Sequence, residues 1–188
     1  MKNARGQAMV ELALVLPLCV VLSLGVIEVS YALLDQHIVT KLTREGSNLI
    51  SRDTSLQDAA TALSNMSSGP VDFNTSSTVI FSVIKRVATT SAANYNKDIL
   101  YQRYSYGAIA ATSQLSTAGS GSFGSAPDYI ANNSDNDTSL QITNLPAGLL
   151  TTGGMLYVTE IYTKHTLITP FDKFGITVPN ILYSIAYF

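Results

Sequence analysis

The sequence has little of what catalysis and covalent cross-linking use. Its 188 residues include one cysteine, two histidines and no tryptophan, and only 13% of them carry charge. Because one cysteine cannot form an intramolecular disulfide, noncovalent packing must hold any domain of this chain together. Lys and Arg number eleven against thirteen Asp and Glu, and this mildly acidic balance without a basic stripe argues against nucleic acid as a partner.

Sequence motifs for phosphate, metal or nucleophile chemistry are also missing. Neither a G-x-x-x-x-G-K-[ST] phosphate loop nor a nucleophile elbow occurs. His37 and His165 have no Cys, His or acidic residue at metal-ligand spacing beside them. Residues 135–137 (Asp-Asn-Asp) begin like a calcium loop, but Leu140 stands where an EF-hand needs glycine, so solvated acids are expected there and weak calcium binding is the alternative. We therefore expect no enzyme, no catalytic or metal-binding residues, no cofactor and no small-molecule substrate.

What the chain has instead is a long apolar run near its amino terminus. Residues 12–27 contain no ionisable group other than Cys19, and counting back to Ala8 gives twenty residues, about the length that a helix needs to cross a bilayer core. Lys2 and Arg5 precede the run and acidic residues follow it, so the charge asymmetry predicts a cytoplasmic amino terminus. No signal-peptidase site follows in a suitable place, and we expect the anchor to stay.

Individual residues of this run have interpretations of their own. Cys19 is expected to be a lipid-facing apolar thiol. Pro17 cannot donate the usual backbone hydrogen bond, so it predicts a modest helix kink. Glu11 lies near one membrane face, where an acid usually has a partner and solvation at the interface is the alternative. Glu28 lies at the opposite face, where headgroups and water are expected to solvate it.

The amino-terminal motif resembles that of a known family. Residues 5–11 read RGQAMVE, so Gly6 closes a short hydrophilic leader and Glu11 is the fifth residue after it. With the apolar run and its continuation through Gly46, this segment resembles the amino-terminal region of the TadE-like minor pilins (pseudopilins) of tight-adherence (Tad/Flp) pilus systems. The resemblance implies cleavage between Gly6 and Gln7 by a prepilin peptidase. It also implies that Glu11 faces the new amino terminus of a neighbouring subunit and sets the register of assembly.

The rest of the chain predicts a pilin-like α+β fold. Apolar residues at helical spacing from Tyr31 to Leu49 extend the anchor into a stalk helix, which Gly46 is expected to weaken. Residues 53–55 (Asp-Thr-Ser) with Asp58 predict a capped second helix that runs to about Met66. Four β-rich segments predict an antiparallel sheet of about four strands, with a short edge piece at 140–142. The predicted strands are residues 78–87, 99–107, 155–163 and 180–188.

Three further features concern the loops and aromatic residues. Residues 113–137 are rich in Ser, Gly, Ala and Asn and predict an exposed, mobile loop. Residues 169–179 predict a crossover that brings Phe171 and Phe174 over the sheet. A group of tyrosines predicts packing between strands, with an adhesive aromatic platform as the alternative. These tyrosines are Tyr95, Tyr101, Tyr104 and Tyr106.

These observations predict three parts of the chain. They are a prepilin-type leader (1–6), a transmembrane and stalk helix (7–52) and an extracytoplasmic α+β domain (53–188). The predicted function is a pilin-like structural subunit, specifically a minor pilin or pseudopilin in pilus assembly and surface adhesion. The alternatives are a principal filament subunit and a permanently anchored envelope binding domain. The expected partners are a prepilin peptidase, other pilin subunits through the amino-terminal helix, and lipid of the bacterial inner membrane, from which the protein would pass into a pilus.

Overall fold

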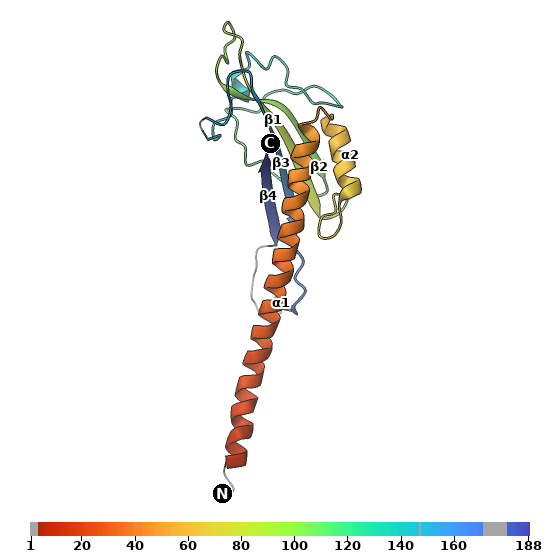
Figure 1. Ribbon diagram of the computed structural model, residues 1–188, viewed down its shortest axis with the longest axis vertical. Helices are drawn as coiled ribbons and strands as arrows, with labels where there is room; N and C mark the ends of the chain where they lie inside the picture. The colour runs from red at the N-terminus through yellow and green to blue at the C-terminus, as the bar shows by residue number, and fades with distance from the viewer. Residues whose placement is uncertain (1–3, 147, 171–179) are drawn as a thin grey trace.

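The protein consists of one long helix whose carboxyl-terminal end carries a head (Figure 1). A computed structural model describes residues 4–146, 148–170 and 180–188. The head combines a short helix with a four-stranded antiparallel sheet, so the predicted α+β class is confirmed. The described elements are α1 (Ala4–Ile50), α2 (Leu56–Met66), β1 (Ser77–Arg86), β2 (Asp98–Gly107), the 3₁₀ turn η1 (Thr138–Leu140), β3 (Met155–Lys164) and β4 (Ile181–Tyr187).

Helix α1 is 47 residues long, and its sequence explains why it continues so far. It is rich in Leu, which is a good helix former. The hydroxyls of Ser23 and Ser30 each donate to the backbone carbonyl four residues earlier, at 2.8 Å, so these polar groups are satisfied within the apolar half. Pro17 lies inside the helix. The helix also continues through Gly46 and ends at Ile50.

Helix α2 begins with the predicted cap and ends at the predicted residue. Ser55 Oγ accepts a hydrogen bond from the backbone amide of Asp58 at 3.1 Å and donates to the Asp58 carboxylate at 2.7 Å. These contacts satisfy an amide that the helix itself leaves free. One face of α2 is buried against α1 and the sheet, and it consists of Leu56, Ala59, Ala60 and Leu63.

The sheet has the strand order β2-β1-β3-β4, and every neighbouring pair is antiparallel. The four strands agree with the predicted ranges to within one residue at each end. The predicted edge piece at 140–142 is not a strand, because η1 includes its first residue, but Gln141 makes an isolated bridge with Ile99 of the edge strand β2 and Ile142 makes one with Thr117. Side chains alternate between the two faces of the sheet.

The face of the sheet that α1 and α2 cover holds the largest core cluster (Figure 1). Phe81 and Ile161 lie there with Val39 of α1. Gly46 explains how closely the helix approaches the sheet, since a Cβ atom at this position would lie 2.7 Å from Thr159 Cγ2 and 3.3 Å from Phe81 Cε1. The glycine therefore permits helix–sheet contact, and this packing outweighs its low helix propensity.

The opposite face of the sheet is covered by the long connection between β2 and β3. The central polar residue of this face of the sheet is Glu160, which is 0% exposed. The Ser113 hydroxyl and the Gln114 amide donate to this carboxylate, the latter at 2.7 Å, and the Tyr183 hydroxyl donates at 3.1 Å. Burial and the charge of Glu160 raise the pKa of the neighbouring Tyr162 hydroxyl to about 12.

The prediction of an exposed loop over residues 113–137 is therefore wrong for parts of this segment. Its first residues hydrogen-bond Glu160, and Leu115 and Ala131 are buried in core clusters. The physical reason is that a buried carboxylate needs several donors, and this connection supplies two of them. The predicted crossover with Phe171 and Phe174 lies outside the described residues.

The acidic residues 135–137 and the tyrosines have protein partners. Asp135 pairs with Lys85 at 2.9 Å, which contradicts the expectation of merely solvated acids, and Lys85 holds the pKa of this carboxyl below its usual range. Tyr104 stacks on Tyr129 with ring centroids 4.3 Å apart. Tyr106 packs against the ring of Phe73 in the helix-side core. Both tyrosines therefore pack against other aromatic rings, but their partners lie in connections and not in neighbouring strands, so packing between strands is not what these pairs show.

Candidate functional site: the free half of α1 and the Glu28 clasp

The amino-terminal half of α1 projects from the head with little protein around it (Figure 1). Most of its large apolar side chains from Met9 to Leu34 are exposed, between 44% at Ile27 and 75% at Met9. None of its most apolar 18 residues is buried. Exposed apolar area costs about 25 cal/mol per Å² in water, so a continuous surface of this extent requires an apolar environment.

Among the described residues, α1 alone is long and apolar enough to cross a membrane. Core helices of soluble proteins meet the same criterion, but they are mostly buried, whereas this segment is not. A cleaved signal sequence also meets it. Here the same helix continues beyond its apolar run and supplies Val39, Leu42 and Ile50 to the core of the head. Helix α1 thus has the length, composition and exposure of a membrane anchor.

The predicted processing and assembly residues lie in the amino-terminal part of α1. Gly6 is exposed, and apart from its chain neighbours and the backbone of its own helix no described atom lies within 4 Å of the place that a Cβ would take. Gln7 Nε2 donates to Glu11 Oε1 at 3.0 Å, one helical turn further along. Glu11 and Pro17 are both exposed, so both face whatever surrounds the free half of α1. The roles predicted for Gly6, Gln7, Glu11 and Pro17 stay predictions.

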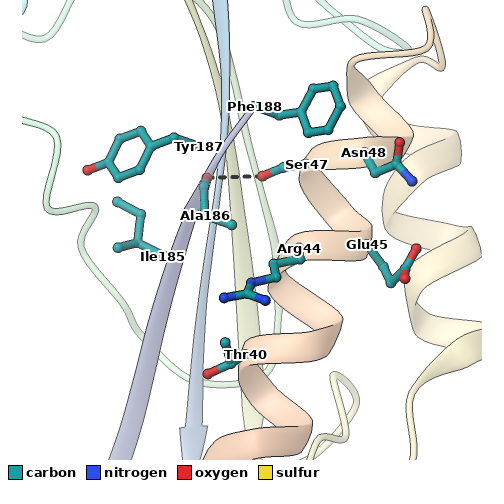
Figure 2. A pocket seen from close by; sticks show the side chains of 9 residues that line it. All are labelled: Thr40, Arg44, Glu45, Ser47, Asn48, Ile185, Ala186, Tyr187 and Phe188. Carbon is teal, nitrogen blue, oxygen red and sulfur yellow. Dashed lines mark hydrogen bonds between the residues drawn. The ribbon is translucent and has the colours of Figure 1, made fainter. Parts of the chain in front are cut away.

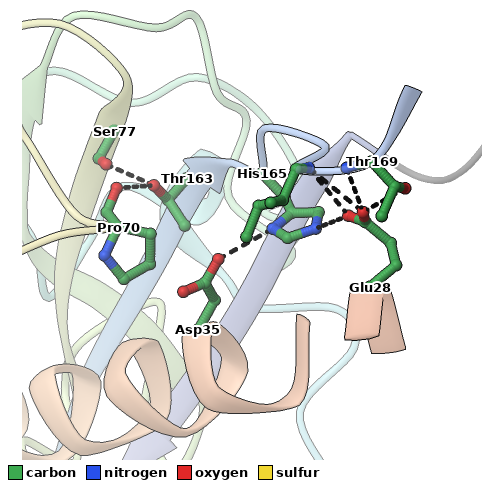
Figure 3. Close-up of polar contacts among 8 residues, drawn as sticks. Glu28, Asp35, Pro70, Ser77, Thr163, His165 and Thr169 are labelled. Atoms are coloured by element: carbon green, nitrogen blue, oxygen red, sulfur yellow. Dashed lines mark hydrogen bonds and ion pairs between the residues drawn. The ribbon is translucent and has the colours of Figure 1, made fainter. Parts of the chain in front are cut away.

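Glu28, at the other end of the apolar run, is not solvated as predicted. Glu28 is only 5% exposed, because the loop after β3 covers it (Figure 3). Oε2 of Glu28 accepts hydrogen bonds from the amides of Ile168 at 3.2 Å and Thr169 at 2.9 Å, and from the Thr169 hydroxyl at 2.6 Å. Buried carboxylates need such donors, and here the head provides them.

His165 completes this contact by joining two acids of α1. Its Nε2 lies 3.3 Å from Glu28 Oε1, and its Nδ1 lies 2.9 Å from Asp35 Oδ2 (Figure 3). The two acids are seven residues apart, about two turns, so they share one face of the helix. We refer to Glu28, Asp35, His165, Ile168 and Thr169 as the Glu28 clasp. It fastens the loop after β3 to α1.

The clasp was missed in the sequence because its partners are remote from one another. His165 and Thr169 follow Glu28 by 137 and 141 residues. No acid stands at metal-ligand spacing beside His165 in the sequence, so the local pattern does not indicate its acidic partners on α1. One signal was present, since Glu28 and Asp35 place two acids on the same face of a helix that is otherwise apolar there.

A groove of about 530 Å³ lies between the packed half of α1 and the end of β4 (Figure 2). Ser47 Oγ donates across it to the carbonyl of Ala186 at 3.0 Å. Among the described residues that line the groove, only Arg44 and Glu45 have charged side chains. In the described ranges as a whole, no three His, Cys, Asp or Glu side chains lie close enough together to hold a metal ion.

Comparison with known proteins places the likeness in α1. Residues 6–48 match the family model described as TadE-like protein. The match begins at Gly6 and ends two residues before α1 does, so it includes Glu11, Glu28 and Asp35 and excludes the sheet. The chain matches no curated protein and no solved structure. The chain is therefore TadE-like over residues 6–48, and this match supports a Tad pilus-related, pilin-like protein.

Proposed function

We propose that this chain is a minor pilin or pseudopilin of a Tad-type pilus, processed by a prepilin peptidase between Gly6 and Gln7. The observation that carries the proposal is the exposed apolar half of α1, which lies within the TadE-like match. This surface suits two successive environments, the bilayer before assembly and the apolar helices of other pilin subunits after it. Both environments remove the same side chains from water.

The proposed orientation follows from the flanking charges. Lys2 and Arg5 precede the apolar run, and positive flanks stay in the cytoplasm. The head would then lie outside the inner membrane, and assembly would carry it to the pilus. Cleavage after Gly6 removes both of these cations from the chain.

Glu11 is the proposed register residue. A carboxylate within an apolar run costs up to about 3 kcal/mol unless it has a partner. Gln7 already lies within hydrogen-bonding distance of Glu11 in this chain, and cleavage would give Gln7 a free ammonium group. In a filament, the ammonium group of one subunit would pair with Glu11 of its neighbour, a charge-assisted contact that fixes their relative position.

Processing is tested by replacing Gly6 with leucine in cells that contain the pilus system. We expect Gly6→Leu to accumulate as a precursor that still carries residues 1–6, which mass spectrometry of the amino terminus will detect. Gly25→Leu is the matched control, because it adds the same side chain to the same helix far from the junction. Normal maturation of Gly6→Leu would contradict the proposal.

Assembly is tested separately through Glu11 and through abundance. Glu11→Gln is expected to be processed normally but to be lost from sheared pili, whereas Glu45→Gln in the packed half of α1 should be retained. Quantitative mass spectrometry of sheared pili then distinguishes a minor from a principal subunit. A chain that dominates this material is the principal subunit, and one that never leaves the membrane is a permanently anchored domain.

A further inference from the structure

The Glu28 clasp fixes the position of the head along the axis of α1. Strand β4 meets the helix at Gln36, whose Nε2 donates to the Tyr183 carbonyl at 3.0 Å. The loop after β3 contacts the helix at Glu28, eight residues nearer the amino terminus, which is a distance of about 12 Å along the helix axis. The head therefore extends down the helix well below its own sheet, as the path of this loop beside α1 shows (Figure 1).

Glu28 also marks the end of the segment that fits a bilayer. It follows Ile27 directly, the last residue of the charge-free run, and twenty apolar residues span a hydrocarbon core of about 30 Å. With that run in the membrane, Glu28 stands at the boundary between acyl chains and headgroups. The loop that hydrogen-bonds Glu28 must lie at the same boundary.

That loop presents an apolar side chain beside the clasp. The backbone amide of Ile168 donates a hydrogen bond to Glu28, yet Ile168 is 57% exposed. The exposed apolar surface of α1 is adjacent, since Ile27 and Val29 flank Glu28 and are exposed as well. Ile168 thus continues the same apolar surface from the helix onto the head, and what covers the helix is the natural partner for both.

The clasp lowers the free-energy cost of placing the Glu28 carboxylate at this boundary. An unpaired carboxylate at the edge of the hydrocarbon core would hold water around itself and keep the loop away from lipid. In the clasp, two amides, a hydroxyl and an imidazole surround Glu28, so the head satisfies the charge that would otherwise require water.

We propose that Ile168 inserts into the outer interface of the membrane that α1 spans, and that the Glu28 clasp holds it there. The head then rests directly on the lipid surface and does not stand away from it on a free stalk. This inference rests on the anchoring role of α1 in the proposed function. Its partner is the apolar edge of a lipid bilayer, and the contact is apolar in character.

The absence of tryptophan from the chain permits a direct test. Three single-tryptophan variants of the full chain are placed in phosphatidylcholine vesicles with bromine at defined acyl positions. Ile168→Trp is expected to show blue-shifted emission and quenching by bromine near the headgroup. Leu18→Trp, in the middle of the span, should be quenched by deep bromine. Leu149→Trp, which precedes β3 at the far end of the sheet, should not be quenched.

The controls separate this inference from the proposal on which it rests. If Leu18→Trp is quenched but Ile168→Trp is not, the head stands clear of the membrane and the inference is overturned while the anchor remains. If neither is quenched, the anchor itself is wrong and the inference falls with it.

The role of the clasp is tested in the Ile168→Trp chain. Glu28→Gln keeps the volume of the side chain and removes its charge, and it is expected to lose most of the shallow quenching and to shift emission to the red. Glu45→Gln, the matched change in the packed half of α1, should leave both signals as they were. Shallow quenching that survives Glu28→Gln would show that the clasp does not hold Ile168 in the membrane.

Discussion

The two halves of α1 form one continuous helix but differ in what surrounds them. From Met9 to Leu34 the large apolar side chains are mostly exposed, whereas Val39, Leu42 and Ile50 are buried against the sheet and α2. Helix propensity alone does not explain this difference, because both halves are helical although the free half contains Pro17 and Gly25 and the packed half contains Gly46. The difference lies in the partner: the packed half has one within its own chain, and the free half needs one from outside.

The acids of the same helix repeat this difference. Glu11 is exposed, and its hydrogen bond in the described structure comes from Gln7 of its own turn. Glu28 is buried and is satisfied by residues from the distant end of the chain. The Glu28 carboxylate therefore has its hydrogen-bond partners within the fold. For Glu11, we propose that the partner comes from another molecule.

The largest expected effect concerns the packed half. Phe81 is fully buried where α1 lies on the sheet, so Phe81→Ala should lower the free energy of unfolding by about 3–5 kcal/mol. The measurement is urea denaturation of the full chain in detergent, followed by near-ultraviolet circular dichroism of the tyrosines. Leu14→Ala, which truncates an exposed residue of the free half, should leave this value unchanged. Equal destabilisation by both changes would mean that the two halves are not distinct.

The next effect concerns the free half. An arginine near the centre of a membrane helix costs about 3 kcal/mol on insertion scales, so Leu18→Arg should weaken membrane insertion. Alkaline carbonate extraction of membranes is expected to release a large part of this variant. Thr61→Arg, on the exposed surface of α2, adds the same charge to the head and should remain membrane-bound. If both variants stay in the pellet, the free half is not the spanning element.

A smaller effect is expected at the helix–sheet contact. Gly46→Ala gains about 1 kcal/mol of helix propensity but places Cβ 2.7 Å from Thr159 Cγ2, and overpacking of a core costs about 1–3 kcal/mol. We expect net destabilisation in the same urea assay. Adding Thr159→Ser removes the clashing methyl group and should restore stability in the double variant. A stabilised single variant would indicate that the helix can move away from the sheet without cost.

The smallest effect concerns pH and the ion pair between Asp135 and Lys85. Because the pKa of Asp135 is lowered in the folded protein, its contribution is present above the unfolded value of about 3.9 and is lost as pH falls through the lower folded value. Both side chains are partly exposed, so the contribution is about 1 kcal/mol or less. Asp135→Asn should lower the urea midpoint at pH 7 and should approach wild type near pH 2. A constant difference at both pH values would exclude the ionised pair as its cause.

Much of the fold could be predicted from local patterns. The length of the apolar run, the Ser55 cap of α2 and the ranges of four strands each depend on residues within a short window, where spacing and turn chemistry decide. The TadE-like motif is equally local, since the matched segment falls entirely on α1. Such features persist because neighbouring residues alone establish them.

The sequence by itself therefore determined that this protein has a long apolar helix followed by a small antiparallel head. Only the tertiary structure decided which residues of these elements are covered. Glu28 is buried in the clasp, Gly46 lies in close contact with the sheet, and the loop beside Glu160 is packed against it. In each case the contacting residues lie far away in the sequence. Burial of a charge or a close approach of backbones depends on what the fold brings near, and no local pattern records that.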